Sequence, residues 1–320
     1  MKNLFNFATK ELSQDAFLRW LFESYNDEEL QPCVNALLKE FCDIKVNSED
    51  TVKTYAQWQK IDIKVDIQKN TGEKVMLLIE DKAFSGEHDQ LKRYNEKLVR
   101  YESKGYKIHK VFYKTSLLSQ KDIRATKNNG WASYDINSIY KLFNPFENTE
   151  NIILKQYIEY LYELYSAVNN EIKPKSSDNW IDWLSWISYF EKKIIPNFEN
   201  KYIAGCEKLA QYPYVNFYLK IEKEMPYFEI RSRDCCNNNF KGYILCYGVK
   251  DLTPQDKVIN KIKQDNIFKC ERLVHRNGGK PKQIGKYEAT NIDTDEKFLA
   301  EVKRCSEYYS EVMSNWRSNI

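Results

Sequence analysis

Apolar and polar residues alternate in two neighbouring stretches of the chain, "WQKIDIKVDI" (58–67) and "VMLLIEDKAF" (75–84). Such alternation predicts half-buried strands, because successive side chains of a strand point to opposite faces of a sheet. In the second strand Glu80 and Lys82 share a face, and Asp81 points away from it. In the first strand the apolar and charged residues are predicted on opposite faces: Ile61, Ile63, Val65 and Ile67 against Asp62, Lys64 and Asp66.

Helical periodicity precedes and follows this strand pair. Apolar residues recur every three or four positions in the flanking segments, which predicts amphipathic helices, and shorter alternating segments predict further strands. The order of elements predicts an α/β fold, a mixed sheet with one helical crossover between parallel strands. In chain order the predicted elements are helices 11–25 and 29–42, strands 51–58, 58–67 and 75–84, helix 88–104, and strands 106–114 and 131–136.

The second half of the chain shows a different pattern. A helix rich in Tyr, Leu and Ile (149–168) is followed by a polar segment with Pro174, which predicts a linker. Beyond it the predicted segments are helical at 180–212, strand-rich at 213–249, helical at 254–265, a basic Gly-rich loop at 274–287, and helical at 294–317. The predicted domains are a core of residues 1–148, a helix and linker of 149–179, and an α+β domain of 180–320 with an unassigned role in substrate or partner binding.

Composition narrows the class of protein. The net charge is only +3, so nucleic-acid binding would depend on a local patch such as the basic segment 97–127, which could equally be a solvated helix face and loop. No stretch reaches the roughly 18 consecutive apolar residues of a membrane span, and the N-terminus lacks the apolar core of a signal peptide. Eight cysteines without a Cys-x-x-Cys pair argue against a zinc ribbon and indicate a reducing, cytoplasmic setting. Cys235 and Cys236 are expected as accessible free thiols.

The connection between the two strands sets their pairing. If residues 70–72 form a three-residue turn with Gly72 in the left-handed conformation, residues 69 and 73 pair. Asp62 then lies directly opposite Glu80, and Lys82 lies one pair further along on the same face. Asp66 would lie roughly 13 Å from Glu80 at the usual rise of a strand, too far to share an ion. The spacing therefore selects Asp62 as the partner of Glu80.

Two facing carboxylates repel each other unless a cation lies between them. Asp62, Glu80 and the backbone carbonyl of Asp81 offer hard oxygen ligands, which suit Mg²⁺ or Mn²⁺. A bound ion of this kind activates water and neutralises phosphate charge, and Lys82 could orient that water. The chemistry predicted is hydrolysis of a phosphodiester. The alternative is a surface cluster of salt bridges, which is common on the outer faces of antiparallel sheets.

The pattern of Asp62 followed by Glu80-Asp81-Lys82 resembles the PD-(D/E)XK nuclease superfamily. Ile61 stands where that motif has its proline, a weakly constrained position. The resemblance covers roughly residues 1–145 and implies a restriction-endonuclease-like core, a mixed central sheet flanked by helices, with an α+β C-terminal region. It also implies that Asp62 and Glu80 bind the metal ion, with Asp81 contributing its backbone carbonyl, and that Lys82 acts on the water.

Two further elements carry the resemblance. Gln90 and Tyr94 match a Q-x-x-x-Y element of the exonuclease-like branch, and at positions i and i+4 they share one helix face. Glu11 opens a helix that resembles the first helix of a bacterial branch, in which the leading acid completes the metal shell; Asp15, one turn later, could take that place. Tyr94 could instead be a core aromatic residue, and Glu11 could serve the helix terminus.

The resemblance implies a Mg²⁺- or Mn²⁺-dependent endo- or exodeoxyribonuclease with DNA as its partner and a role in defence or DNA processing. Two alternatives stay open at this point: a non-cleaving nucleic-acid-binding module that kept the fold, and an RNA-directed nuclease. The oligomeric state is also left open, a homodimer included. No membrane partner is expected.

Overall fold

The computed structural model describes residues 3–7, 11–83, 90–198, 203–209, 212–218, 227–246, 260–269 and 282–317. The chain divides into two compact units, residues 1–166 and 167–320, here called the N-terminal and the C-terminal unit. None of the helices in the described residues has the length and apolar character that a membrane crossing requires.

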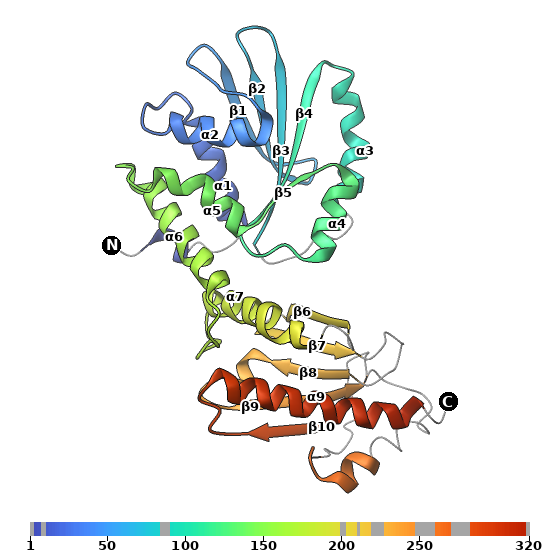
Figure 1. The fold of residues 1–320 in the computed structure, drawn as a ribbon. Coiled ribbons are helices and arrows are strands. Elements are labelled where there is room, and N and C mark those ends of the chain that lie inside the picture. The colour runs from blue at the N-terminus through green and yellow to red at the C-terminus, as the bar shows by residue number, and fades with distance from the viewer. Residues whose placement is uncertain are drawn as a thin grey trace. The chain divides into compact units, whose positions relative to one another are not determined.

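A five-stranded mixed sheet forms the centre of the N-terminal unit (Figure 1). β1, β2 and β3 are antiparallel neighbours, whereas β3, β4 and β5 run parallel to one another. The predicted class, a mixed sheet flanked by helices, is therefore confirmed. The strands are β1 (Thr51–Trp58), β2 (Ile61–Gln68), β3 (Lys74–Lys82), β4 (Tyr106–Lys114) and β5 (Ala132–Tyr134).

Two helices make the parallel crossovers. α3 (Gln90–Glu102) joins β3 to β4, as predicted, and α4 (Gln120–Asn129) joins β4 to β5. α4 was not predicted, because the segment is so polar that it shows little apolar periodicity. Its ends do carry signals: Ser119 and Asp122 form a capping box, and Gly130 ends the helix with a left-handed φ of 66°.

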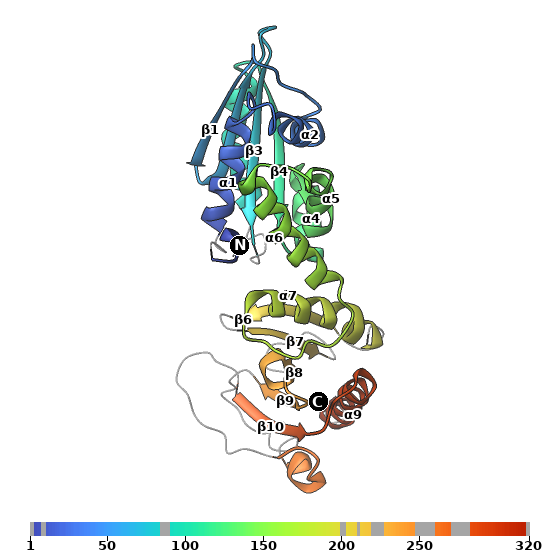
Figure 2. The same ribbon diagram turned by 90° about the vertical axis from the view of Figure 1, so that its left-hand side faces the viewer.

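Helices cover both faces of this sheet (Figure 1, Figure 2). On one face α3 packs on β3 through a cluster of buried residues: Ile61, Met76, Leu78, Leu91, Tyr94, Leu98, Phe112 and Trp131. Ile61 was predicted on the opposite, apolar face; as the first residue of β2 it follows a tight turn and joins the α3 side instead. On the other face lie α1 (Glu11–Glu23), α2 (Gln31–Cys42), α5 (Ile136–Phe143) and α6 (Ile152–Asn169).

The predicted register of the β2–β3 hairpin is confirmed. Lys69 N donates to Glu73 O (2.9 Å), and Gly72 closes the turn with φ 92°, a conformation that favours glycine. The ladder runs from Gln68 paired with Lys74 to Ile63 paired with Ile79. One step further in the same register brings Asp62 opposite Glu80.

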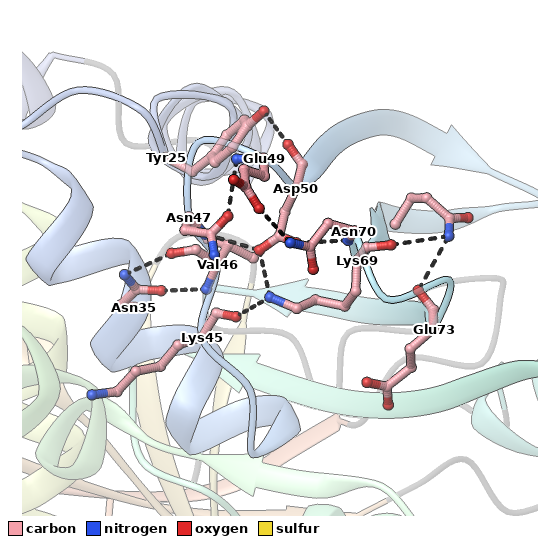
Figure 3. Close-up of polar contacts among 11 residues, drawn as sticks. Tyr25, Asn35, Lys45, Val46, Asn47, Glu49, Asp50, Lys69, Asn70 and Glu73 are labelled. Atoms are coloured by element: carbon pink, nitrogen blue, oxygen red, sulfur yellow. Dashed lines mark hydrogen bonds and ion pairs between the residues drawn. The ribbon is translucent and has the colours of Figure 1, made fainter.

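A polar network at the closed end of this hairpin holds the register in place (Figure 3). Asp50, whose side chain is fully buried, accepts hydrogen bonds from Asn47 N (2.9 Å) and Asn70 N (3.0 Å) and forms an ion pair with Lys69. Lys69 Nζ also donates to Lys45 O (2.7 Å). The loop before β1 is thereby tied to the tip of the β2–β3 hairpin, so a slip of one residue would break several buried bonds.

The C-terminal unit contains a second five-stranded sheet, which is antiparallel throughout, in the order β10-β9-β8-β7-β6. Two predictions are wrong here: residues 203–209 form a strand rather than a helix, and residues 282–287 belong to a strand rather than a loop. The periodicity of a short segment can fit either a helix or a strand, and pairing with neighbouring strands determines which of the two forms. The strands are β6 (Ile203–Leu209), β7 (Tyr212–Tyr218), β8 (Tyr227–Arg231), β9 (Phe240–Cys246) and β10 (Lys282–Ala289).

Helices α7 (Trp180–Tyr189) and α9 (Asp295–Arg317) pack on this sheet and share one apolar core with it. Cys235 and Cys236 belong to that core and are buried, so the expectation of accessible thiols is wrong. The predicted role of residues 180–320 in substrate or partner binding stays a prediction. Short helical segments complete the described chain: Leu4–Asn6, Asn144–Phe146, Phe190–Ile194, Ile195–Phe198, Ser232–Asp234 and 260–265.

Candidate active site

Three of the predicted site residues come together where β2 begins and β3 ends. Asp62 is the second residue of β2, and Glu80 and Lys82 are the last two residues of β3 on the same face. Glu80 is 1% exposed and Lys82 is 7% exposed, while Asp62 is half-buried. The alternating geometry of both strands, in the register described above, is what aims the three side chains at one point.

The ammonium group of Lys82 lies among three oxygen atoms. Its Nζ donates to Glu80 Oε1 (2.7 Å) and to the backbone carbonyl of Asp81 (3.0 Å), and it lies 3.5 Å from Asp62 Oδ2. These are the same three groups that the sequence analysis assigned to a metal ion. Their convergence on one positive charge shows that the donor set suits a cation.

Each oxygen of Asp62 has its own donor. Oδ2 accepts from the backbone N–H of Asp81 (2.9 Å), and Oδ1 accepts from Gln57 Nε2 (2.8 Å). The first bond ties the start of β2 to the end of β3. The second comes from the end of β1, so the carboxylate is oriented from both sides.

Glu80 is held less completely. Burial is the main reason why the pKa of Glu80 rises to about 7, and the neighbouring charge of Asp62 adds to this rise. The Lys82 ammonium acts in the opposite direction and lowers the pKa. Its Oε2 atom is buried, and no donor in the described part of the chain reaches it. A buried acceptor without a donor is costly, and a bound cation would satisfy it.

Tyr94 lies beside this acidic pair. It is buried on α3, and its hydroxyl donates to the backbone carbonyl of Lys60 (2.7 Å). Burial, followed by the charges of Glu80 and Asp62, raises the pKa of Tyr94 to about 12, so it stays a neutral donor. Gln90, the first residue of α3, lies one turn earlier on the same helix and is half-buried.

The side chain of Asp81 lies on the opposite face of the sheet, as predicted. It is fully buried and accepts a hydrogen bond from Gln14 Nε2 of α1. Asp15, the alternative to Glu11, is also buried. Glu11 is the first residue of α1, but its side chain lies outside the described residues, so its predicted place in the metal shell stays a prediction.

The side chains alone do not make a complete metal site in the described residues, where no group of three or more His, Cys, Asp or Glu side chains is arranged to hold an ion. The local donors are two carboxylates and one backbone carbonyl. A hard divalent ion commonly keeps several water ligands, so this smaller donor set still fits Mg²⁺ or Mn²⁺.

Two lysines of the basic segment 97–127 are engaged inside the fold. Lys114 is buried and pairs with Asp122 (2.8 Å), and Lys110 donates to Asn95 Oδ1 (3.1 Å) and Asn129 O (3.2 Å). These two lysines stabilise the contacts among β4, α3 and α4. They are therefore engaged inside the fold and do not offer their charge to a phosphate.

Two residues near the site were missed by the sequence analysis. Gln57 lies opposite Asp62, because Tyr55 pairs with Lys64 in the β1–β2 hairpin and the register continues from there. A register for this hairpin, worked out as for β2–β3, could have found it. Gln14 is one helical turn beyond Glu11, and no sequence signal marks its bond to Asp81.

Comparison with known proteins agrees with this geometry. A family model described as the PD-(D/E)XK nuclease superfamily matches residues 2–179, more than half of the chain. The match covers both crossover helices and the acidic pair and ends before α7, so residues 180–320 lie outside it. Searches of curated proteins and of solved structures gave no match.

Proposed function

Because the chain belongs to the PD-(D/E)XK nuclease superfamily, we propose that it is a Mg²⁺- or Mn²⁺-dependent nuclease that hydrolyses phosphodiester bonds in DNA. The family implies a nucleic-acid substrate and phosphodiester hydrolysis in general. The observation that supports a bound metal ion is the position of the Lys82 ammonium, which Glu80, the Asp81 carbonyl and Asp62 surround.

In this proposal Asp62 and Glu80 hold the divalent ion with the backbone carbonyl of Asp81, and Glu11 adds a ligand from α1. When bound, such an ion lowers the pKa of a coordinated water and offsets charge on a phosphate oxygen. The buried acceptor atom Glu80 Oε2 supports this assignment, because none of the described residues donates to it and a cation would satisfy it.

Lys82 has two tasks. Without metal its ammonium screens the repulsion between Asp62 and Glu80. With substrate bound it orients the attacking water and donates to the charge that builds up on the phosphate. Gln90 and Tyr94 support the site from α3. Tyr94 is held to the turn before β2 by its bond to Lys60 O, and its uncharged side chain lies beside the two acids.

The test is a cleavage assay on linear duplex, circular duplex and single-stranded DNA and on RNA of the same sequence, each with Mg²⁺ or with EDTA. Cleavage of DNA that requires Mg²⁺ is the expected result. A shift in gel mobility without cleavage, unchanged by EDTA, would instead identify a binding module. Cleavage confined to RNA would make the chain an RNA-directed nuclease, and cleavage of circular DNA would identify an endonuclease.

A further inference from the structure

The turn between β1 and β2 has an unusual backbone. Three of the four residues 57–60 have positive φ values: Gln57 near the end of β1 (48°), and the turn residues Gln59 (54°) and Lys60 (75°). None of them is glycine, although this left-handed region strongly favours glycine. Conformations of this kind persist only where the surrounding structure imposes them, and they concentrate at functional sites.

Helix α3 holds the two turn residues, Gln59 and Lys60. Tyr94 donates its hydroxyl to Lys60 O (2.7 Å), and Lys97 Nζ donates to Gln59 O (3.1 Å). Gln59 Nε2 in turn donates to the Tyr101 hydroxyl (3.1 Å). The backbone of the turn is thus bound to α3 at two consecutive carbonyls, and one of the two donors is the tyrosine of the Q-x-x-x-Y element.

The conformation brings one side chain to the site. Gln57 lies at the surface, and its Nε2 donates to Asp62 Oδ1 (2.8 Å). The Gln57 amide on Oδ1 and the Asp81 N–H on Oδ2 together fix the rotation of the carboxylate, with Oδ2 towards the Lys82 ammonium. Glycine at position 57 would adopt the same φ without strain, but it would leave Oδ1 without this donor.

We propose that Gln57 is a positioning residue whose amide fixes the rotation of the Asp62 carboxylate, so that one of its oxygens faces the bound ion. This inference rests on the proposed function, because it needs Asp62 to be a metal ligand. Outer hydrogen-bond partners of this kind orient metal-binding carboxylates, and their loss typically weakens metal binding about 10- to 100-fold.

The chain contains a matched control two residues away. Gln59 has the same side chain and the same left-handed backbone, but its amide bonds to Tyr101 and not to Asp62. Gln57→Gly and Gln59→Gly therefore both relieve the strain and both delete one amide. They differ in whether the lost amide contacted the proposed metal ligand.

The experiment measures Mn²⁺ binding by isothermal titration calorimetry on the full chain and, separately, the thermal midpoint without metal. Q57G is expected to raise the Mn²⁺ dissociation constant about tenfold or more, while Q59G leaves it unchanged. A midpoint for Q57G no lower than that of Q59G shows that the lost affinity does not come from unfolding. Q57A, which keeps the backbone strain, should lose as much affinity as Q57G.

Two outcomes would overturn the inference alone, and a third would also overturn the metal site of the proposed function. If Q57G binds Mn²⁺ as tightly as the wild type, or if Q59G loses as much affinity as Q57G, Gln57 does not position Asp62. If the wild-type chain takes up no Mn²⁺ at all, the metal site of the proposed function is itself wrong and this inference falls with it.

Discussion

Two acid–lysine pairs with buried acids lie at opposite ends of the β2–β3 hairpin and behave in opposite ways. Asp50 with Lys69 lies at the closed end of β2–β3, and Glu80 with Lys82 lies at the open end. Burial acts to raise the pKa of Asp50, but the Lys69 ammonium and two backbone N–H groups outweigh it, and the pKa lies below the usual range. For Glu80 burial prevails, and its pKa rises to about 7.

The difference lies in the donors rather than in the residue types. A carboxylate that accepts several N–H bonds keeps its charge in the interior, and it serves the structure. Glu80 has a lysine but a second acid nearby, and its Oε2 has no donor in the residues that the structure describes. An incompletely satisfied acid of this kind is suited to binding a cation, which connects the electrostatics of the fold to the proposed chemistry.

The largest effect is expected from replacing Lys82 with alanine, and the same change at Lys69 is the control. Lys82→Ala should lower the rate of DNA cleavage by about a hundredfold to a thousandfold, because charge developing on the phosphate loses its positioned donor. Mn²⁺ uptake should largely survive. Lys69→Ala, the matched control, should lower stability but leave the rate per folded molecule unchanged. Initial rates at saturating metal check this, and normal cleavage by the Lys82 variant would show that its assigned role is wrong.

The next effect is on stability at the closed end. Asp50→Ala removes a buried carboxylate that pairs with Lys69 and accepts two backbone N–H bonds. We therefore expect a loss of about 3 kcal/mol in the free energy of unfolding. Native-state hydrogen exchange of the β2 and β3 amides measures it within this unit. Glu49→Ala, at the exposed neighbouring position, should cost less than about 0.5 kcal/mol. Equal losses for the two variants would contradict the structural role given to Asp50.

The smallest effect is a pH dependence that separates the two acids. The folded metal-free chain holds a proton on Glu80 more tightly than the unfolded chain does, so its contribution to stability is present below pH 4.5 and is lost as the pH rises towards 7. Asp50 has the opposite sign: its contribution is present above the unfolded pKa and is lost as the pH falls through the lowered folded pKa.

Glu80→Gln should therefore gain stability over the wild type between pH 4.5 and 7, by on the order of 2 kcal/mol. Hydrogen exchange of the β3 amides at several pH values, in EDTA, measures the difference. A constant difference between the two proteins across this range would mean that Glu80 titrates as an ordinary glutamate.

The parts of the fold that were predictable depend on residues close in sequence. Alternation along 58–67 and 75–84, with Gly72 in the turn, led to the register that places Asp62 opposite Glu80. Two elements were harder to predict. α4 is too polar for apolar periodicity to show it, and β6 was taken as helix because its identity depends on pairing with β7.

The sequence alone determined the face and the spacing of Asp62, Glu80 and Lys82, because strand periodicity and turn length are local properties. Tertiary structure decided the rest: the amide of Gln57 on Asp62, the N–H groups around Asp50, and a Glu80 Oε2 that no donor among the described residues reaches. Burial and hydrogen-bond partners depend on segments far apart in the chain, and these contacts determine which acid is charged and structural and which is left to take a metal ion.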